Sequence, residues 1–175
     1  MLDSSTDLKS MLSDPSLLQT QAFINNQWVD GENGATFAVS NPARGDVIAQ
    51  VADLSRADLA RAIDGAEAAQ KKWAAQTAKE RCNILRNWYN LMMEHQSDLA
   101  MILTAEMGKP LAEAMGEIAY GASFVEFFAE EAKRNYGETI PGHQADTRIT
   151  VIKQPIGVAA SITPWNFPNA MITRK

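Results

Sequence analysis

The sequence has few of the residues that bind metals or cross-link a chain. Its one cysteine, Cys82, excludes an intrachain disulfide, and its two histidines, His95 and His143, stand far apart. None of the three belongs to a cluster with the ligand spacing of a metal site. Neither a structural zinc site nor a disulfide-stapled scaffold is therefore indicated.

Runs of like charge and long apolar segments are also missing. The 21 acidic and 16 basic residues give a net charge of -5 and are dispersed along the chain. Nucleic acids and anionic membranes are bound by clustered Lys and Arg, so neither is an expected partner. No apolar stretch could cross a bilayer, and residues 1–20 lack the basic and apolar regions of a secretory signal. We expect a cytoplasmic protein.

What is present begins with a composition typical of one globular domain. The chain has 175 residues, of which 46% are apolar and 21% charged. Residues 1–20 are predicted to form a loose lead-in. The segment "AFINNQWV" (22–29) predicts a hairpin around Asn25-Asn26, because asparagine tolerates the positive φ of a tight turn. "TFAVS" and "VIAQV" predict two more short strands, which together make an antiparallel β meander.

The pattern then changes to helices. A capping box beginning at Ser55 predicts a helix to about Gln76, and a second box at Thr77 opens what reads as the longest helix. The apolar face of that helix continues to Leu103 at three- and four-residue steps. Gly108 is the expected stop, and a third helix should follow from Pro110 to near Gly137. Its Gly116 and Gly121 weaken a helix, which predicts close packing against a neighbour at both positions.

Strand signals return after the third helix. "TRITVIK" is charged at both ends and partly alternating, which is typical of an edge or interface strand. "IGVAASI" (156–162) carries no charge and predicts a short strand buried in a parallel sheet. The predicted fold class is α/β: a β meander, three helices, an edge strand and the first strand of a parallel sheet.

The sequence Pro164-Trp165-Asn166-Phe167-Pro168 follows that strand. Ligands of open α/β sheets bind at the carboxyl ends of the strands, which is where this segment would lie. The prolines stiffen it on both sides, and the amide of Asn166 could donate to a developing oxyanion. The alternative is structural, because asparagine is also a common turn residue and Trp and Phe commonly pack in cores.

Several segments resemble the aldehyde dehydrogenase superfamily, in particular the bacterial NADP-preferring succinate-semialdehyde dehydrogenases. The resemblance runs from Ala22 to Lys175. It rests on "NPARGDVIAQV", "TAKERCNILRNWYNLMMEHQSDLA", "EMGKPLAEAMGEIAYGASFVEFFAEEAKRNYGETIPGHQAD", "VIKQPIGV" and "PIGVAASITPWNFPNAMITRK". It implies the N-terminal part of the aldehyde dehydrogenase fold. Residues 21–138 and 155–175 would belong to a Rossmann-like coenzyme-binding domain, and 139–154 to an oligomerisation segment.

The resemblance also implies roles for individual residues. Thr163, Pro164, Trp165 and Asn166 match positions that contact the nicotinamide half of NADP or NAD. Asn166 matches the amide that donates to the oxyanion formed when a cysteine thiolate attacks the aldehyde. Arg174 matches a residue that holds the substrate's distal carboxylate, although a solvated or dipole-pairing helix charge is the alternative. The implied partner is a small aldehyde with a distal carboxylate, in a homo-oligomer when complete.

Other residues remain ambiguous or structural. Lys175 matches a lysine near the family's active site, and a structural ion pair is equally compatible with it. Cys82 lies outside any Gly-Gln-x-Cys sequence, so a packing role is expected and the catalytic cysteine and glutamate are missing. Family members are nearly three times longer, so we expect the N-terminal fragment of an enzyme. The alternatives are a non-catalytic truncated product, or a sister enzyme such as a glutarate-semialdehyde dehydrogenase.

Overall fold

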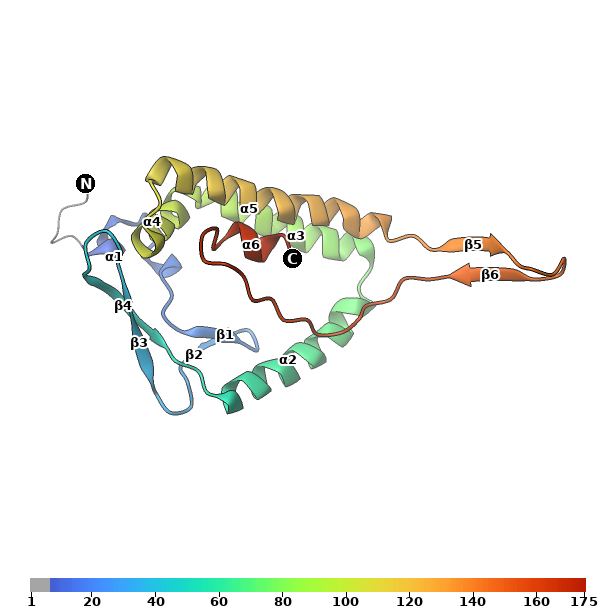
Figure 1. Ribbon diagram of the computed structural model, residues 1–175, viewed down its shortest axis with the longest axis horizontal. Coiled ribbons are helices and arrows are strands. Elements are labelled where there is room, and N and C mark those ends of the chain that lie inside the picture. Colours follow the sequence, from blue (N-terminus) through green and yellow to red (C-terminus); the bar gives the residue numbers. More distant parts are fainter. Residues whose placement is uncertain (1–6) are drawn as a thin grey trace.

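The structure is a computed structural model that describes residues 7–175. Short β-hairpins, a group of packed helices and a long extended segment succeed one another along the chain (Figure 1). The elements are α1 (Leu8–Met11), η1 (Pro15–Leu17), β1 (Ala22–Ile24), β2 (Gln27–Val29), β3 (Thr36–Ser40), β4 (Val47–Ala52), α2 (Arg56–Ala75), α3 (Ala78–Glu94), α4 (Gln96–Met107), α5 (Leu111–Glu131), η2 (Ala132–Arg134), β5 (Glu138–Pro141), β6 (Arg148–Val151) and α6 (Ala170–Thr173).

The N-terminal strands form two hairpins. In β1–β2 the turn residues Asn25 and Asn26 both have positive φ (51° and 66°), which confirms the predicted turn. β3 and β4 pair antiparallel as a separate two-stranded sheet, so the predicted continuous meander is wrong. The turn at 31–34 separates β2 from β3. The hairpins are instead linked by a backbone hydrogen bond from Ala52 N to Thr20 O (2.9 Å).

The helices begin where the capping boxes predict. Ser55 with Asp58 caps α2, and Thr77 with Glu80 caps α3. The predicted long helix is, however, two helices: the backbone leaves helical geometry at His95 (φ -97°, ψ 17°), and α4 starts at the next residue. The four longer helices therefore replace the three that were predicted. No Pro or Gly marks the break, so the apolar periodicity runs on through it.

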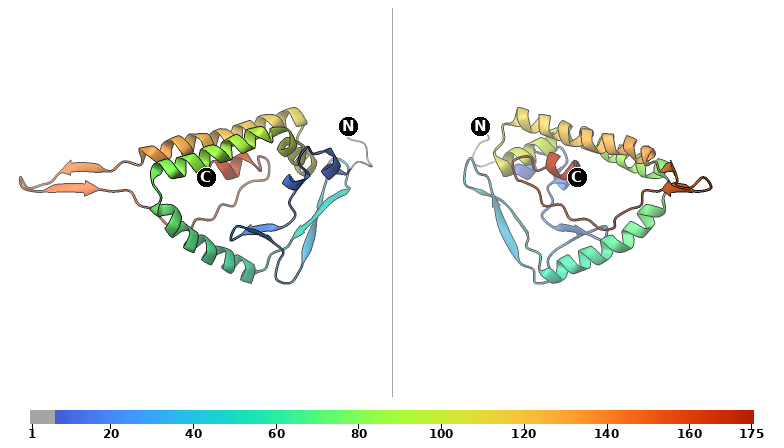
Figure 2. Two further views of the ribbon diagram at one scale, coloured as in Figure 1. Left: turned by 180° about the vertical axis from the view of Figure 1, so that it is seen from behind. Right: turned by 45° about the vertical axis from the view of Figure 1, so that its right-hand side comes forward.

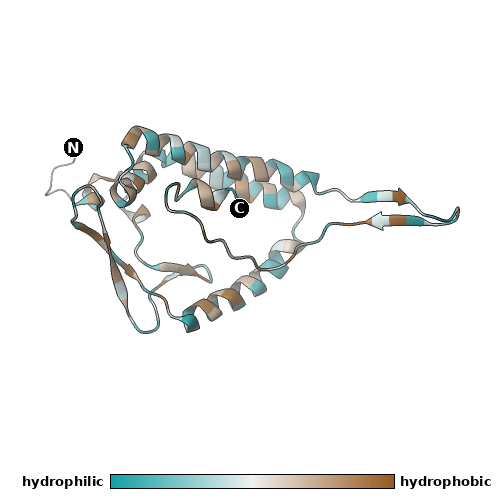
Figure 3. Ribbon diagram, viewed as in Figure 1, coloured by the Kyte–Doolittle hydropathy of each residue, from teal (hydrophilic) through white to brown (hydrophobic). Residues whose placement is uncertain are grey.

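Helices α3, α4 and α5 make the core of the described residues. The buried side chains form two clusters, one centred on α4 with α5 and one on α3 with α5. Their members are Ala100, Leu103, Ala114 and Ile118, and Met92, Ala122 and Val125. Apolar residues of α2, including Leu59 and Ile63, remain exposed, and the ribbon of this separate helix carries hydrophobic colouring in Figure 3. None of the helices among residues 7–175 is both long and apolar enough to span a bilayer.

The chain that follows η2 leaves the helices and then returns to them. β5 and β6 form a fully exposed hairpin that projects from the rest of the molecule (Figures 1 and 2). Residues 152–164 then run back as extended chain without strand pairing, and Ile156 and Ile162 are both 98% exposed. The buried strand predicted over 156–162 is therefore not formed. A parallel strand needs neighbours on its hydrogen-bonding edges, and the described residues supply none here.

Candidate active site

The Pro-Trp-Asn-Phe-Pro segment forms consecutive turns that lead into the short helix α6. The N–H of Met171 donates to the carbonyl of Phe167 (3.0 Å), which closes the entry into the helix. Figures 1 and 2 show α6 lying beside α3 and α5, where the extended segment returns to the core. The candidate site thus rests on the helices and not on the end of a strand.

A buried ion pair lies beneath this segment. Lys109, between α4 and α5, pairs with Glu117 on α5; the two residues are 9% and 3% exposed. The Lys109 ammonium also donates to the backbone carbonyl of Asn166 (3.1 Å) and lies 3.8 Å from the centroid of the Phe167 ring. A cation over an aromatic face is attracted by the ring quadrupole. One buried lysine therefore contacts two consecutive residues of the segment.

The second carboxylate oxygen of Glu117 holds the start of α6. It accepts the backbone N–H groups of Asn169 (3.0 Å) and Ala170 (3.4 Å). These donors have no acceptor within a helix that has only just begun, so a carboxylate satisfies them well. The buried ion pair therefore holds the segment through hydrogen bonds on both sides of Phe167.

The predicted site residues lie largely at the surface, and Asn166 lines an open hollow together with Lys109, Glu117 and Phe167. Trp165 is 77% exposed, Asn166 and Pro164 are exposed, and Thr163 is half-buried. Among residues 7–175 the side-chain amide of Asn166 makes no hydrogen bond. A fixed backbone therefore presents an aromatic face and an amide whose donors remain available.

Arg174 lies at the other end of α6. Its guanidinium is 5.9 Å from the centroid of Phe124, beside an open pocket whose lining includes Tyr120, Phe127 and Phe128. Its side chain makes no ion pair with a described carboxylate. Phe124 is seven residues beyond Glu117 on α5, or about 10 Å along the helix. The two ends of α6 therefore contact α5 about two turns apart, at Glu117 and Phe124, whereas Asn166 is held by Lys109 just before α5 begins.

Close packing of α6 on α5 depends on Gly121. A Cβ at that position would lie 2.2 Å from Nδ2 of Asn169 and 3.2 Å from Oγ1 of Thr173. The predicted close approach is confirmed at Gly121. It is wrong at Gly116, where a Cβ would meet nothing within 4 Å.

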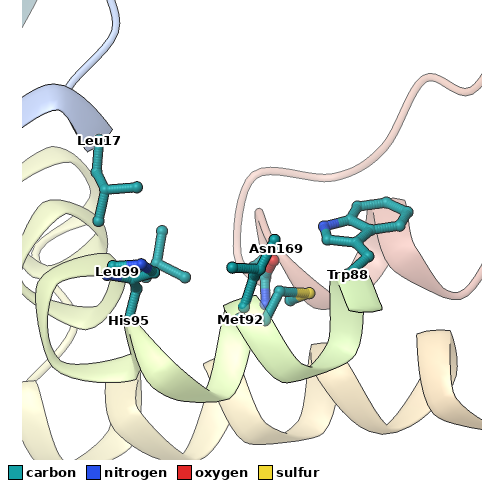
Figure 4. Close-up of a pocket in the computed structure, with 7 residues that line it drawn as sticks. Leu17, Trp88, Met92, His95, Leu99 and Asn169 are labelled. Carbon is teal, nitrogen blue, oxygen red and sulfur yellow. The ribbon is translucent and has the colours of Figure 1, made fainter. Parts of the chain in front are cut away.

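A second hollow lies on the α3 side of the segment (Figure 4). Its lining is mainly apolar, with His95 as the titratable side chain, and Asn169 reaches it from the start of α6. The residues that line it are Leu17, Trp88, Leu91, Met92, His95, Leu99 and Asn169. His95 is half-buried. The hollow offers apolar surface and little acid–base chemistry.

The remaining reactive side chains lie elsewhere. Cys82 is buried in α3, with 4% of its surface exposed, which fits the packing role expected of it. Among the residues that the structure describes, no group of three or more His, Cys, Asp or Glu side chains could hold a metal ion.

Comparison with known proteins identifies the fold. A model of the aldehyde dehydrogenase family matches residues 28–175. This chain belongs to the aldehyde dehydrogenase family. Its α/β fold is the N-terminal part of the aldehyde dehydrogenase fold, as the resemblance predicted.

Individual family members are closely similar. The chain is 62% identical over 164 residues to the NADP(+) succinate-semialdehyde dehydrogenase of Escherichia coli strain K12, and 60% identical over 164 residues to the glutarate-semialdehyde dehydrogenase of Pseudomonas aeruginosa. The crystal structure of an E. coli NADP-dependent enzyme superposes with a TM-score of 0.92 at 62% identity. Each match covers 94% of this chain. The chain spans 34%, about a third, of the length of each of these proteins.

Sequence reasoning overlooked Lys109 and Glu117. Lys109 lies between Gly108 and Pro110, the residues at which one predicted helix ends and the next begins. Glu117 offered a usable signal, because it falls three residues after Ala114 and four before Gly121 on the packed face of α5. A carboxylate on a buried helix face needs a cationic partner, and Lys109 is that partner.

Proposed function

We propose that this chain is part of a dehydrogenase that oxidises succinate semialdehyde to succinate with NADP or NAD as acceptor. The chain supplies the segment 163–166 and Arg174, whereas the cysteine nucleophile and the glutamate base come from other residues of the polypeptide. The observation that carries the proposal is that one segment bears both an available amide at Asn166 and a guanidinium at Arg174. Lys109 holds the segment near Asn166, and Arg174 lies beside Phe124.

Asn166 is the chain's contribution to the chemical step. A cysteine thiolate attacks the aldehyde carbon, and the Asn166 amide donates to the oxygen on which negative charge develops. A nicotinamide cofactor held beside residues 163–166 would supply the acceptor for the hydride, and water activated by the base would then hydrolyse the thioester. Removing an oxyanion donor lowers turnover by about 100- to 1,000-fold, which is the loss we expect for Asn166→Ala.

The exposed segment offers side chains whose shape and polarity suit the nicotinamide end of the cofactor. Trp165 offers a flat apolar surface and Asn166 an uncharged amide, which suit a planar ring that carries a carboxamide. Thr163 and Pro164 adjoin them. The choice between NADP and NAD rests on residues that face the ribose 2′ position, and NADP is proposed from the similarity to the E. coli enzyme.

Arg174 would select the substrate through its distal carboxylate. A guanidinium can hold a carboxylate through two parallel hydrogen bonds, and bonds to charged groups contribute about 1.5–3 kcal/mol each. Aromatic side chains line the open pocket beside it, and Arg174 itself is exposed. Losing about one such bond should lower kcat/KM roughly 10- to 100-fold.

The test compares an acid-bearing aldehyde with a neutral one in the full-length gene product. Arg174→Met should lower kcat/KM for succinate semialdehyde by at least tenfold and leave that for butanal within twofold. Arg56→Met, an exposed arginine at the start of α2, is the matched control and should change neither. Equal losses for both aldehydes in Arg174→Met would show that the assigned carboxylate contact is wrong.

There are two alternatives to this proposal, a narrower one of substrate and one of a different class. A glutarate-semialdehyde dehydrogenase is the first, because a protein with that name is nearly as similar as the succinate-semialdehyde enzyme. Turnover of the two semialdehydes by the same preparation separates them.

The second alternative is a non-catalytic product that associates with intact subunits through the projecting hairpin β5–β6. Detection with an antibody against residues 77–108 decides it: a band several times 19.2 kDa favours the enzyme, and one near 19.2 kDa favours the non-catalytic product.

The same hairpin supports the proposed homo-oligomer of the complete enzyme. Both of its strands are exposed along their whole length, and exposed strand edges can pair with another chain. A cytoplasmic location is proposed with it.

A further inference from the structure

We propose that the buried Lys109–Glu117 pair is a positioning device for the Asn166 amide. The proposal rests on the oxyanion role proposed above for that amide. Neither Lys109 nor Glu117 would touch the substrate. Both would act through the backbone of residues 166–170, which they hold against α5.

Lys109 fixes the residue that carries the amide. Its ammonium donates to the Asn166 carbonyl at 3.1 Å, while the face of Phe167 covers it at 3.8 Å from the ring centroid. Holding the carbonyl restricts the backbone of Asn166, so that the amide moves mainly by rotation about the side-chain bonds. An oxyanion donor works best when its position needs no reorganisation during the reaction.

Glu117 fixes the other end of the segment. One carboxylate oxygen pairs with Lys109, and the other accepts the N–H groups of Asn169 and Ala170. The ion pair therefore spans the turns from 166 to 170 as a single clamp. A 1 Å displacement of a catalytic group can cost on the order of a hundredfold in rate, so such a clamp has a measurable consequence.

The stability of the fold alone gives little reason for this pair. Replacing a buried ion pair by uncharged residues of similar volume commonly leaves the stability of the fold unchanged or raises it. Removing one partner alone leaves a buried charge unpaired and destabilises the fold. The informative variant is consequently the double substitution Lys109→Met with Glu117→Gln. The glutamine oxygen can still accept the Asn169 and Ala170 N–H groups, so the start of α6 keeps an acceptor.

The experiment is a mutant cycle in the full-length gene product. The double substitution should lower kcat for succinate semialdehyde about tenfold or more. In an Asn166→Ala background the same double substitution should change kcat by less than twofold, because the group that it positions is already gone. The matched control, Lys71→Met with Glu67→Gln, alters an exposed ion pair on α2 and should leave kcat unchanged in both backgrounds.

The outcomes distinguish this proposal from the one it rests on. If the two sets of losses simply multiply, or if the double substitution leaves kcat unchanged while Asn166→Ala lowers it, the positioning proposal is wrong and the oxyanion role stands. If Asn166→Ala leaves kcat unchanged, the oxyanion role is wrong and the positioning proposal falls with it. Thermal unfolding of each variant shows whether a loss of kcat reflects loss of folded protein.

Discussion

The two glycines of α5 should respond in opposite ways to the same substitution. Gly116 lies on an exposed face of the helix, and a Cβ there would meet nothing within 4 Å. Gly116→Ala should therefore raise the free energy of unfolding by about 1 kcal/mol, which is the difference between the two residues in a helix interior. At Gly121 the same gain is opposed by a collision with α6.

The size of that opposition follows from the contacts of Asn169. Its Nδ2 would be 2.2 Å from the new Cβ and must move, which breaks its bond to the Glu117 carbonyl (3.5 Å). Thr173 would still be 3.2 Å away. Overpacking of this kind costs about 1–3 kcal/mol, so Gly121→Ala should be neutral or destabilising by up to about 2 kcal/mol.

Urea unfolding of this chain, followed by circular dichroism, measures both substitutions. The Asn169→Ala substitution provides the internal check, because it removes the side chain that the Cβ would meet. The cost of Gly121→Ala should be smaller in that background, which is a favourable coupling between the two positions. If Gly121→Ala stabilises the chain as much as Gly116→Ala does, α6 does not pack on α5 as described.

Two further predictions concern side chains that accept backbone N–H groups, namely Asp98 and the cap of α3. Backbone N–H groups of Ser13 and Asp14 donate to Asp98 and hold the pKa of its carboxyl below the ordinary value. The ionised carboxylate therefore adds to the free energy of unfolding above about pH 4, and this contribution is lost as the pH falls further. Asp98→Asn should flatten the acid side of a plot of unfolding midpoint against pH; an unchanged slope would contradict the assignment. Thr77→Ala should lower the free energy of unfolding by about 1 kcal/mol in urea, since it removes the α3 cap, whereas Glu80→Gln keeps an acceptor for the Thr77 N–H and should cost less.

Local features of the fold could be predicted because neighbouring residues determine them. The Asn25-Asn26 turn and the two capping boxes need only a few adjacent side chains and backbone groups, and all three are present. The break at His95 could not be predicted in this way. Asp98, in the first turn of α4, binds backbone groups of residues 13 and 14, which are more than eighty positions away.

The same division applies to the candidate site. The sequence by itself determined the rigid Pro-Trp-Asn-Phe-Pro segment and the family to which it belongs, since both depend on the order of residues. It did not determine whether 156–162 forms a strand, because a strand is stable only beside partners that lie elsewhere in a chain. Only the tertiary structure decided that Lys109 and Glu117 lie beneath Asn166. A buried charge is tolerated only where a partner and hydrogen bonds meet it, and those come here from segments about fifty residues apart.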